Sequence, residues 1–133
     1  MRIRDIILEH SDWAKLNYTE LELHNLHLAA RAIQAGYLKR GVKVRFDKHF
    51  FDQMKLDRGT KKKYTPEVLM MTFGHILKVI DQTFAEDPAG DYVFYDPDTK
   101  INIVMLQDHD GTYVARTTIR AEKFVGPGHK VVV

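Results

Sequence analysis

Two histidines in the middle of the chain, His49 and His75, have side chains suited to acid–base chemistry. Imidazole titrates close to neutral pH, so one histidine can accept a proton while another donates one. Cleavage of RNA is a reaction that such groups can catalyse, because RNA supplies its own nucleophile, the 2′-hydroxyl group. Its cleavage needs a base at that hydroxyl, an acid at the leaving oxygen and cations near the phosphate. His49, His75 and Arg116 are our candidates for catalytic residues.

Basic residues supply candidates for phosphate binding. Three consecutive lysines follow Asp57 and Gly59, and this composition predicts an exposed basic loop. Such a loop would steer RNA toward the protein electrostatically. Two further cations lie at the end of a predicted strand and just after it. The predicted substrate-binding residues are Lys61, Lys62, Lys63, Arg120 and Lys123.

Other catalytic chemistries find little support in the sequence. The chain has no cysteine, which excludes disulfides, thiolate metal ligands and cysteine nucleophiles. His24 and His27 have helical spacing for one metal ion, but no third ligand is fixed by spacing and no HExxH pattern occurs. Turn chemistry explains the acidic residues around His109. Glycine-rich phosphate loops and the GxSxG elbow are also absent. We therefore expect no metal and no cofactor.

The same histidines and cations also fit a purely structural interpretation. His75 lies among apolar positions of its predicted helix, which is typical of a partly buried, hydrogen-bonded histidine. Arginines on a polar sheet face are ordinarily solvated. The catalytic interpretation requires the face that carries Arg116 and Arg120 to look toward both histidines. Spacing along the sequence leaves both interpretations open.

Length and composition limit the possible functions. The 133 residues fit a single domain, and the apolar fraction of 44% is sufficient for a core. The formal net charge of +2 gives no global argument for a polyanionic partner, so local clusters must carry one. No apolar run approaches the roughly 20 residues that span a bilayer, so we expect no membrane partner. Acidic residues interrupt the N-terminal apolar residues, which argues against a signal peptide.

Hydrophobic periodicity predicts an α+β domain, with N-terminal helices packed on a C-terminal antiparallel β-sheet. Residues 1–16 are expected as an arm or short helix, followed by one domain over residues 17–133. Alternation with period two places Arg116 and Arg120 on one face of their strand. Helices are predicted for residues 17–37, after Asp47 and for 66–84, and strands for residues 42–46, 91–96, 101–106, 112–120 and 130–133.

Three segments of the chain resemble the RegB-type phage endoribonucleases, which belong with the RelE-like toxins and related microbial ribonucleases. The segments DKHFFDQM, EVLMMTFGHI and ARTTIRAEKF lie within residues 42–125, in the order of elements of that family. Two short pieces match in detail. One is the histidine, two apolar residues and aspartate at positions 49–52, and the other is a helix in which His75 closely follows Phe73. The resemblance implies that His49 and His75 are catalytic.

The chain departs from the pattern of this family at two positions. The family has an arginine directly after the aspartate, where this chain has Gln53, and Gly74 separates the phenylalanine from its histidine. A glutamate of the family's first helix would correspond to a position near Glu20. The resemblance implies a small phage-type, metal-independent endoribonuclease that meets RNA in the host cytoplasm, or a relative with altered chemistry.

Two non-enzymatic functions remain alternatives. A virion or assembly protein would bind partner chains, or further copies of itself, through the apolar N-terminal segment and the strand at residues 131–133. An exposed strand edge favours such pairing. A nucleic-acid-binding protein without catalysis would show an affinity that falls steeply with salt.

Overall fold

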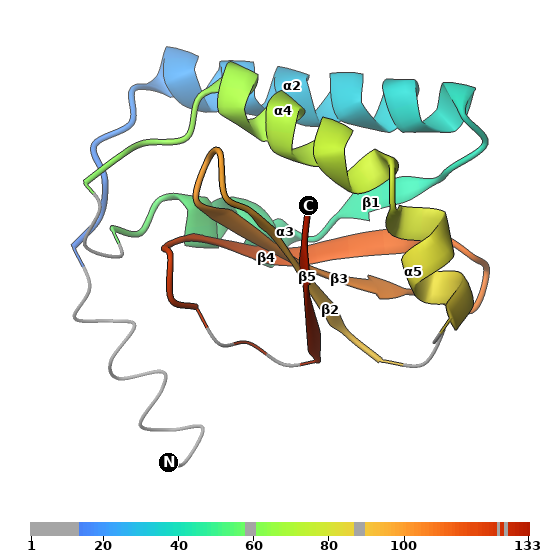
Figure 1. Ribbon diagram of the computed structural model, residues 1–133. Coiled ribbons are helices and arrows are strands. Elements are labelled where there is room, and N and C mark those ends of the chain that lie inside the picture. The colour runs from blue at the N-terminus through green and yellow to red at the C-terminus, as the bar shows by residue number, and fades with distance from the viewer. Residues whose placement is uncertain (1–13, 58–60, 87–89, 125, 127) are drawn as a thin grey trace.

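The computed structural model places helices before a sheet, with one short strand between the helices (Figure 1). It describes residues 14–57, 61–86, 90–124, 126 and 128–133. The predicted α+β fold, with N-terminal helices and a C-terminal sheet, is confirmed. The helices are α2 (Glu20–Lys39), α3 (Lys48–Met54), α4 (Pro66–Leu77) and α5 (Ile80–Glu86). The strands are β1 (Val44–Phe46), β2 (Tyr92–Asp96), β3 (Ile101–Gln107), β4 (Tyr113–Arg120) and β5 (His129–Val132).

The strands form one five-stranded sheet in the order β1-β4-β3-β2-β5. β2, β3 and β4 are the predicted antiparallel meander, because short turns connect each strand to the next. The two outer strands pair in parallel, β1 with β4 and β5 with β2, so the sheet is mixed and not antiparallel throughout as predicted. The early strand thus becomes one edge of the C-terminal sheet.

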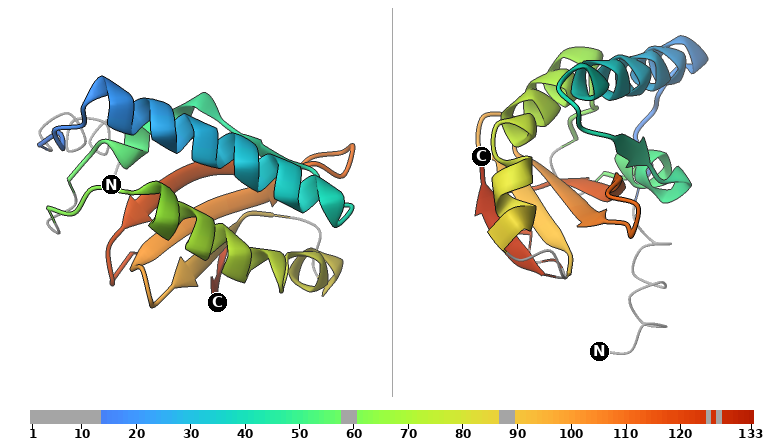
Figure 2. Two further views of the ribbon diagram at one scale, coloured as in Figure 1. Left: turned by 90° about the horizontal axis from the view of Figure 1, so that it is seen from above. Right: turned by 90° about the vertical axis from the view of Figure 1, so that its right-hand side faces the viewer.

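Helices cover one face and one edge of this sheet. α2 and α4 lie side by side over the face, and α5 descends from α4 toward the strands (Figures 1 and 2). α3 packs along the second half of β4, in the place where a longer β1 would pair with that strand. Pairing with β1 ends at Ala115, whose carbonyl accepts the Asp47 N–H at 2.9 Å, and the helix begins directly afterwards. A helix therefore flanks the second half of β4.

Aromatic side chains join the helices to the sheet. Phe46, Phe50 and Phe73 connect β1, α3 and α4, with ring centroids 5.0 Å apart for Phe46–Phe50 and 5.1 Å for Phe46–Phe73. Phe84 of α5 contacts Tyr92 of β2 at 4.8 Å. Phe50, Phe73 and Phe84 are at most 2% exposed. These buried rings fix the position of three helices on the strands.

The continuous helix predicted for residues 66–84 is wrong, because the chain breaks into α4 and α5 at Lys78 and Val79. A straight helix would carry Phe84 away from the strands, whereas α5 turns down to the sheet and packs Phe84 on Tyr92 (Figure 1). Burial of this ring thus outweighs the continuity of the helix. The predicted core residues of the segment are nevertheless all buried: Leu69, Phe73, Ile76, Ile80 and Phe84.

A β-bulge in β4 overturns the predicted alternation of its side chains. The pairing with β3 shifts between Val104 and Met105, which leaves Arg116 as the extra residue. Beyond the bulge, Thr118 faces the helix layer, where its buried hydroxyl is hydrogen-bonded. The prediction that Arg116 and Arg120 share a face is therefore wrong, because one inserted residue exchanges the two faces.

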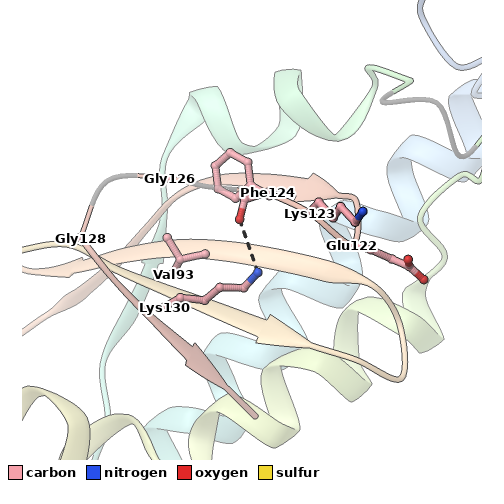
Figure 3. Close-up of a pocket in the computed structure, with 7 residues that line it drawn as sticks. All are labelled: Val93, Glu122, Lys123, Phe124, Gly126, Gly128 and Lys130. Carbon is pink, nitrogen blue, oxygen red and sulfur yellow. Dashed lines mark hydrogen bonds between the residues drawn. The ribbon is translucent and has the colours of Figure 1, made fainter.

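The face of the sheet away from the helices carries a pocket of about 290 Å³ (Figure 3). Lys130 Nζ donates a hydrogen bond to the Phe124 carbonyl across it at 3.4 Å. Gly128 has a φ of +82°, and a Cβ atom there would lie 1.7 Å from the Asp91 carbonyl oxygen, so glycine is required. The lining residues are Val93, Glu122, Lys123, Phe124, Gly126, Gly128 and Lys130.

Most of the predicted N-terminal arm lies outside the described residues. Its described end pairs with the chain after α3, where Leu16 N–H donates to the Lys55 carbonyl at 2.7 Å and Asp57 N–H to the Ala14 carbonyl at 2.9 Å. In the part of the chain that the structure describes, no helix is both long and apolar enough to cross a bilayer.

α2 begins with a capping box formed by Thr19 and Glu22. Thr19 Oγ1 accepts the Glu22 N–H at 3.1 Å, and Glu22 Oε1 accepts the Thr19 N–H at 2.9 Å. Thr19→Ala should lower the free energy of unfolding by about 1 kcal/mol, because it leaves a helix donor unpaired. Thr19→Ser should retain most of the stability. Urea denaturation followed by circular dichroism measures both, and equal losses would contradict the capping role.

Candidate active site

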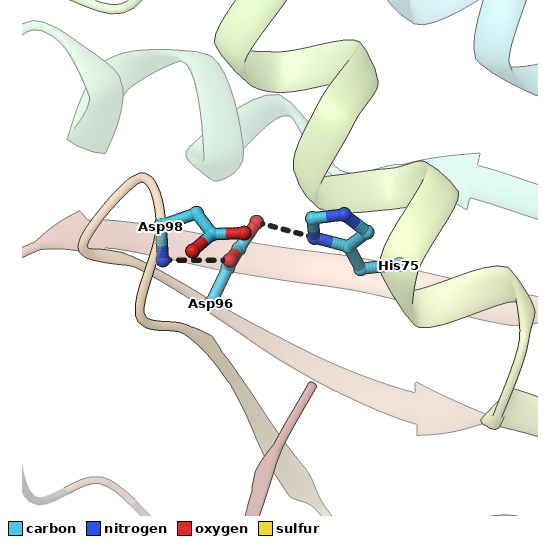
Figure 4. A group of neighbouring side chains, drawn as sticks. All are labelled: His75, Asp96 and Asp98. Atoms are coloured by element: carbon cyan, nitrogen blue, oxygen red, sulfur yellow. Dashed lines mark hydrogen bonds and ion pairs between the residues drawn. The ribbon is translucent and has the colours of Figure 1, made fainter.

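A histidine–aspartate pair lies between α4 and the end of β2. His75 Nδ1 is 2.9 Å from Asp96 Oδ2. The Asp96 side chain is completely buried, whereas 29% of the His75 side chain is exposed. Nε2, the second ring nitrogen, points away from the carboxylate (Figure 4). An aspartate that accepts a hydrogen bond from Nδ1–H orients the ring and leaves Nε2 as the outer proton acceptor.

The turn after β2 holds the Asp96 carboxylate in place. Asp98 N–H donates to Asp96 Oδ1 at 3.0 Å, so both carboxylate oxygens are bonded. Lys100 N–H donates to the Asp96 carbonyl at 2.8 Å, and Lys100 takes the left-handed conformation with a φ of 62°. The hydrogen bond that the Lys100 ammonium donates to the Glu122 carboxylate raises the pKa of Lys100 above its ordinary value. The Lys100 ammonium is thus held at Glu122, from where it also interacts electrostatically with Asp98.

A second buried pair fixes this turn to α4. The hydroxyls of Thr72 and Thr99 are hydrogen-bonded at 2.7 Å, and the two residues are 0% and 3% exposed. Thr72 precedes His75 by three positions, so the bond to Thr99 and the bond to Asp96 leave α4 from the same face. Arg120 of β4 donates through Nε to the Thr99 carbonyl at 3.1 Å. α4, the turn and β4 thus position the pair together.

Asp98 adds a third side chain to this group (Figure 4). One ligand atom each from His75, Asp96 and Asp98 lies within 4.8 Å of the others. An imidazole and two carboxylates at this spacing can coordinate a divalent cation. The bonds from His75 and from the Asp98 N–H to the Asp96 carboxylate also account for the closeness of the three residues.

The other predicted catalytic histidine, His49, is exposed on the first turn of α3. Among the described residues, no hydrogen bond, ion pair or ring contact joins it to His75. His75 is bonded to the end of β2, whereas α3 packs along β4, and β3 runs between these strands. Two strand spacings correspond to about 10 Å. The structure therefore does not bring the two histidines into contact.

Arg116, the third predicted catalytic residue, forms an ion pair with Asp91 at 3.3 Å. Asp91 directly precedes β2 and Asp96 ends it, so this ion pair lies at the opposite end of the strand from His75. Five strand residues span about 16 Å. The structure therefore places Arg116 away from the histidine–aspartate pair.

Two of the predicted phosphate-binding cations hold the structure together. Lys63 Nζ forms an ion pair with Glu22 at 2.8 Å and donates to the Asn17 carbonyl at 3.1 Å. Arg120 Nη1 donates to the Lys63 carbonyl at 2.7 Å, while its Nε bonds Thr99. Arg120 thus connects the basic loop to the turn that carries the buried aspartate.

The remaining predicted cations lie in two places. Lys61 and Lys62 are exposed in the basic loop, where Lys61 N–H donates to Asp57 Oδ1 at 3.0 Å. Lys123 lines the pocket on the face of the sheet away from the helices (Figure 3). Since His75 lies on the helix side, Lys123 and His75 are on opposite faces.

Asp96 is the residue of this site that the sequence patterns do not single out. The segment after Tyr95 is predicted as a turn, and turn preference alone explains aspartates there. One signal was available: alternation in β2 puts Asp96 on the same face as the core residues Tyr92 and Phe94. A charged residue at an inward position needs a buried partner.

Comparisons of the chain with protein-family models, curated proteins and solved structures find no match. The resemblance to RegB-type endoribonucleases therefore stays a prediction. Support for a function comes from the geometry of His75 and Asp96.

The geometry predicts which ring nitrogen of neutral His75 carries the proton. An aspartate oxygen that accepts from Nδ1 favours the Nδ1–H tautomer. Long-range ¹H–¹⁵N correlation spectra, recorded above neutral pH, should show a protonated Nδ1 and an unprotonated Nε2 for His75. The fully exposed side chain of His109 provides the internal reference. A His75 ring protonated at Nε2 would contradict the proposed pairing.

Proposed function

We propose that the protein is a metal-independent, endoribonuclease-type enzyme in which His75 performs acid–base catalysis and Asp96 positions it. The hydrogen bond from partly exposed His75 to a fully buried carboxylate supports this proposal. The other close histidine–aspartate pair among the described residues, His109 with Asp108, is 3.7 Å apart and its ring is fully exposed. Only the His75 pair is held rigidly enough to orient a proton acceptor.

The reaction begins when His75 Nε2 takes the proton of an RNA 2′-hydroxyl and the oxygen attacks the adjacent phosphorus. The bond from phosphorus to the 5′-oxygen breaks, which leaves a 2′,3′-cyclic phosphate on one fragment and a 5′-hydroxyl on the other. Asp96 stabilises the positive charge that forms on the imidazole. The leaving oxygen takes its proton from water in this proposal, because the exposed His49, predicted for this role, lies about two strand spacings from His75.

Exposed cations supply the attraction for phosphate in this proposal. Lys78 follows His75 by three positions at the end of α4, so both side chains lie on one side of the helix. Lys61 and Lys62 are exposed in the basic loop, whose last residue is tied to Arg120. These charges attract a polyanion and make its binding sensitive to salt.

Exposed apolar side chains on the helix layer support a second candidate function, binding of protein partners without catalysis. Leu21 and Leu28 of α2 are 67% and 45% exposed, and Met70 and Met71 of α4 are each 47% exposed. α2 and α4 lie side by side (Figure 2), so one partner can cover both helices. In this function the His75–Asp96 bond is structural.

Cleavage of single-stranded RNA in the presence of EDTA tests the first proposal. We expect the wild type to produce 2′,3′-cyclic phosphate ends and to leave the 2′-O-methyl version of the RNA intact. His75→Gln should lower the rate by at least about 100-fold, because general acid–base catalysis commonly contributes this much. The glutamine amide can still donate to Asp96, so the buried carboxylate keeps a partner. His49→Ala tests the prediction from the sequence that His49 donates the proton to the leaving oxygen.

His109→Ala is the matched control, because this histidine is exposed in a turn. It should cleave like the wild type. Cleavage that His75→Gln leaves unchanged would contradict the assignment of the base. Cleavage that appears only with a divalent cation would contradict the metal-independent reaction. Salt-dependent RNA binding without cleavage would instead favour a nucleic-acid-binding protein, and no RNA binding would favour the protein-binding function.

A further inference from the structure

The two edges of the sheet differ in their protection. At the β1 edge, α3 flanks the second half of β4, and the Gln34 side chain donates to the Val44 carbonyl at 3.2 Å. Such coverage prevents another strand from adding to an edge. β5 forms the opposite border of the sheet (Figure 2). Among the described residues, no side chain bonds to the outer side of its backbone.

Alternate residues of β5 direct their backbone groups away from the sheet. His129 N–H donates to the Asp91 carbonyl at 3.3 Å, and Val133 N–H donates to the Tyr95 carbonyl at 2.8 Å. Lys130 and Val132 therefore point their N–H and C=O groups outward. Both are exposed, Val132 at 66%. An open row of backbone donors and acceptors beside an exposed valine is a template for a further strand.

We propose that β5 pairs antiparallel with β5 of a second copy of the chain, so that two sheets join across a two-fold axis at Val131. In this register Lys130 lies opposite Val132 of the second copy, and each such pair exchanges two backbone hydrogen bonds. The interface is isologous, because the same surface serves both copies.

The side chains of β5 favour its own copy as the occupant of this edge. Lys130 and Val132 lie on the same face, next to Val93 and Tyr95 of β2. Lys130 Nζ lies over the Tyr95 ring, 4.6 Å from its centroid, and bonds the Phe124 carbonyl, so the two ammonium groups stay apart. The first carbons of the Lys130 side chain then lie beside the exposed Val132 of the second copy. A register that sets Lys130 against Lys130 would bring like charges together. Val131, on the opposite face, meets its own copy at the axis.

Sedimentation equilibrium of the full chain tests this pairing. We expect a monomer–dimer equilibrium for the wild type and for Val132→Thr, which keeps the N–H group and the β-branched shape. Val132→Pro should be monomeric wherever the wild type is dimeric. Proline removes an outward-pointing N–H but none of the donors that bond β2. A monomeric wild type at all concentrations, or a Val132→Pro variant that dimerises equally, would overturn the proposal.

Hydrogen exchange of the wild type provides a test that needs no variant. The amides of Lys130 and Val132 should exchange more slowly as the protein concentration rises. Those of His129 and Val133, which bond Asp91 and Tyr95, should stay protected at every concentration. Exchange at Lys130 and Val132 that does not depend on concentration would overturn the proposal, whatever the activity toward RNA.

Discussion

The carboxylate of Asp96 sits inside the interface between helices and sheet, and an unpaired charge there would cost several kcal/mol. Its two oxygens are satisfied by the His75 ring and the Asp98 N–H, so α4 and the turn after β2 must be held together. The buried bond between Thr72 and Thr99 strengthens the same junction. The need to pair one buried charge thus fixes the orientation of His75, the histidine whose Nε2 atom we propose as the proton acceptor.

Much of the fold follows from the spacing of apolar residues. The stripe of α2 and the alternation in β2 and β3 depend on local periodicity, and all three elements form where that periodicity predicts them. Features that depend on distant partners do not follow. The break at Lys78 arises because Phe84 packs on Tyr92, and the parallel pairs of β1 and β5 depend on strands far away in the sequence. Long-range pairing leaves little trace in a local pattern.

The candidate site shows the same division. His75 stands out because an imidazole on an apolar helix face needs a partner, but the partner comes from a turn 21 positions away. Arg116 and Arg120 would share one face under strict alternation, but the β-bulge places them on opposite faces. Arg120 then bonds two carbonyls, and Arg116 pairs with Asp91. Residue type alone shows only that a side chain carries a positive charge, whereas its surroundings decide whether it stabilises the structure.

We propose that RNA meets the protein at the Nε2 side of His75. NMR titration with a 2′-O-methyl oligonucleotide, which lacks the attacking hydroxyl group, tests it most directly. We expect the His75 ring resonances, together with the amide resonances from Asp96 to Lys100, to shift most strongly as the oligonucleotide binds. Saturable binding that shifts residues elsewhere and leaves His75 unchanged would contradict it.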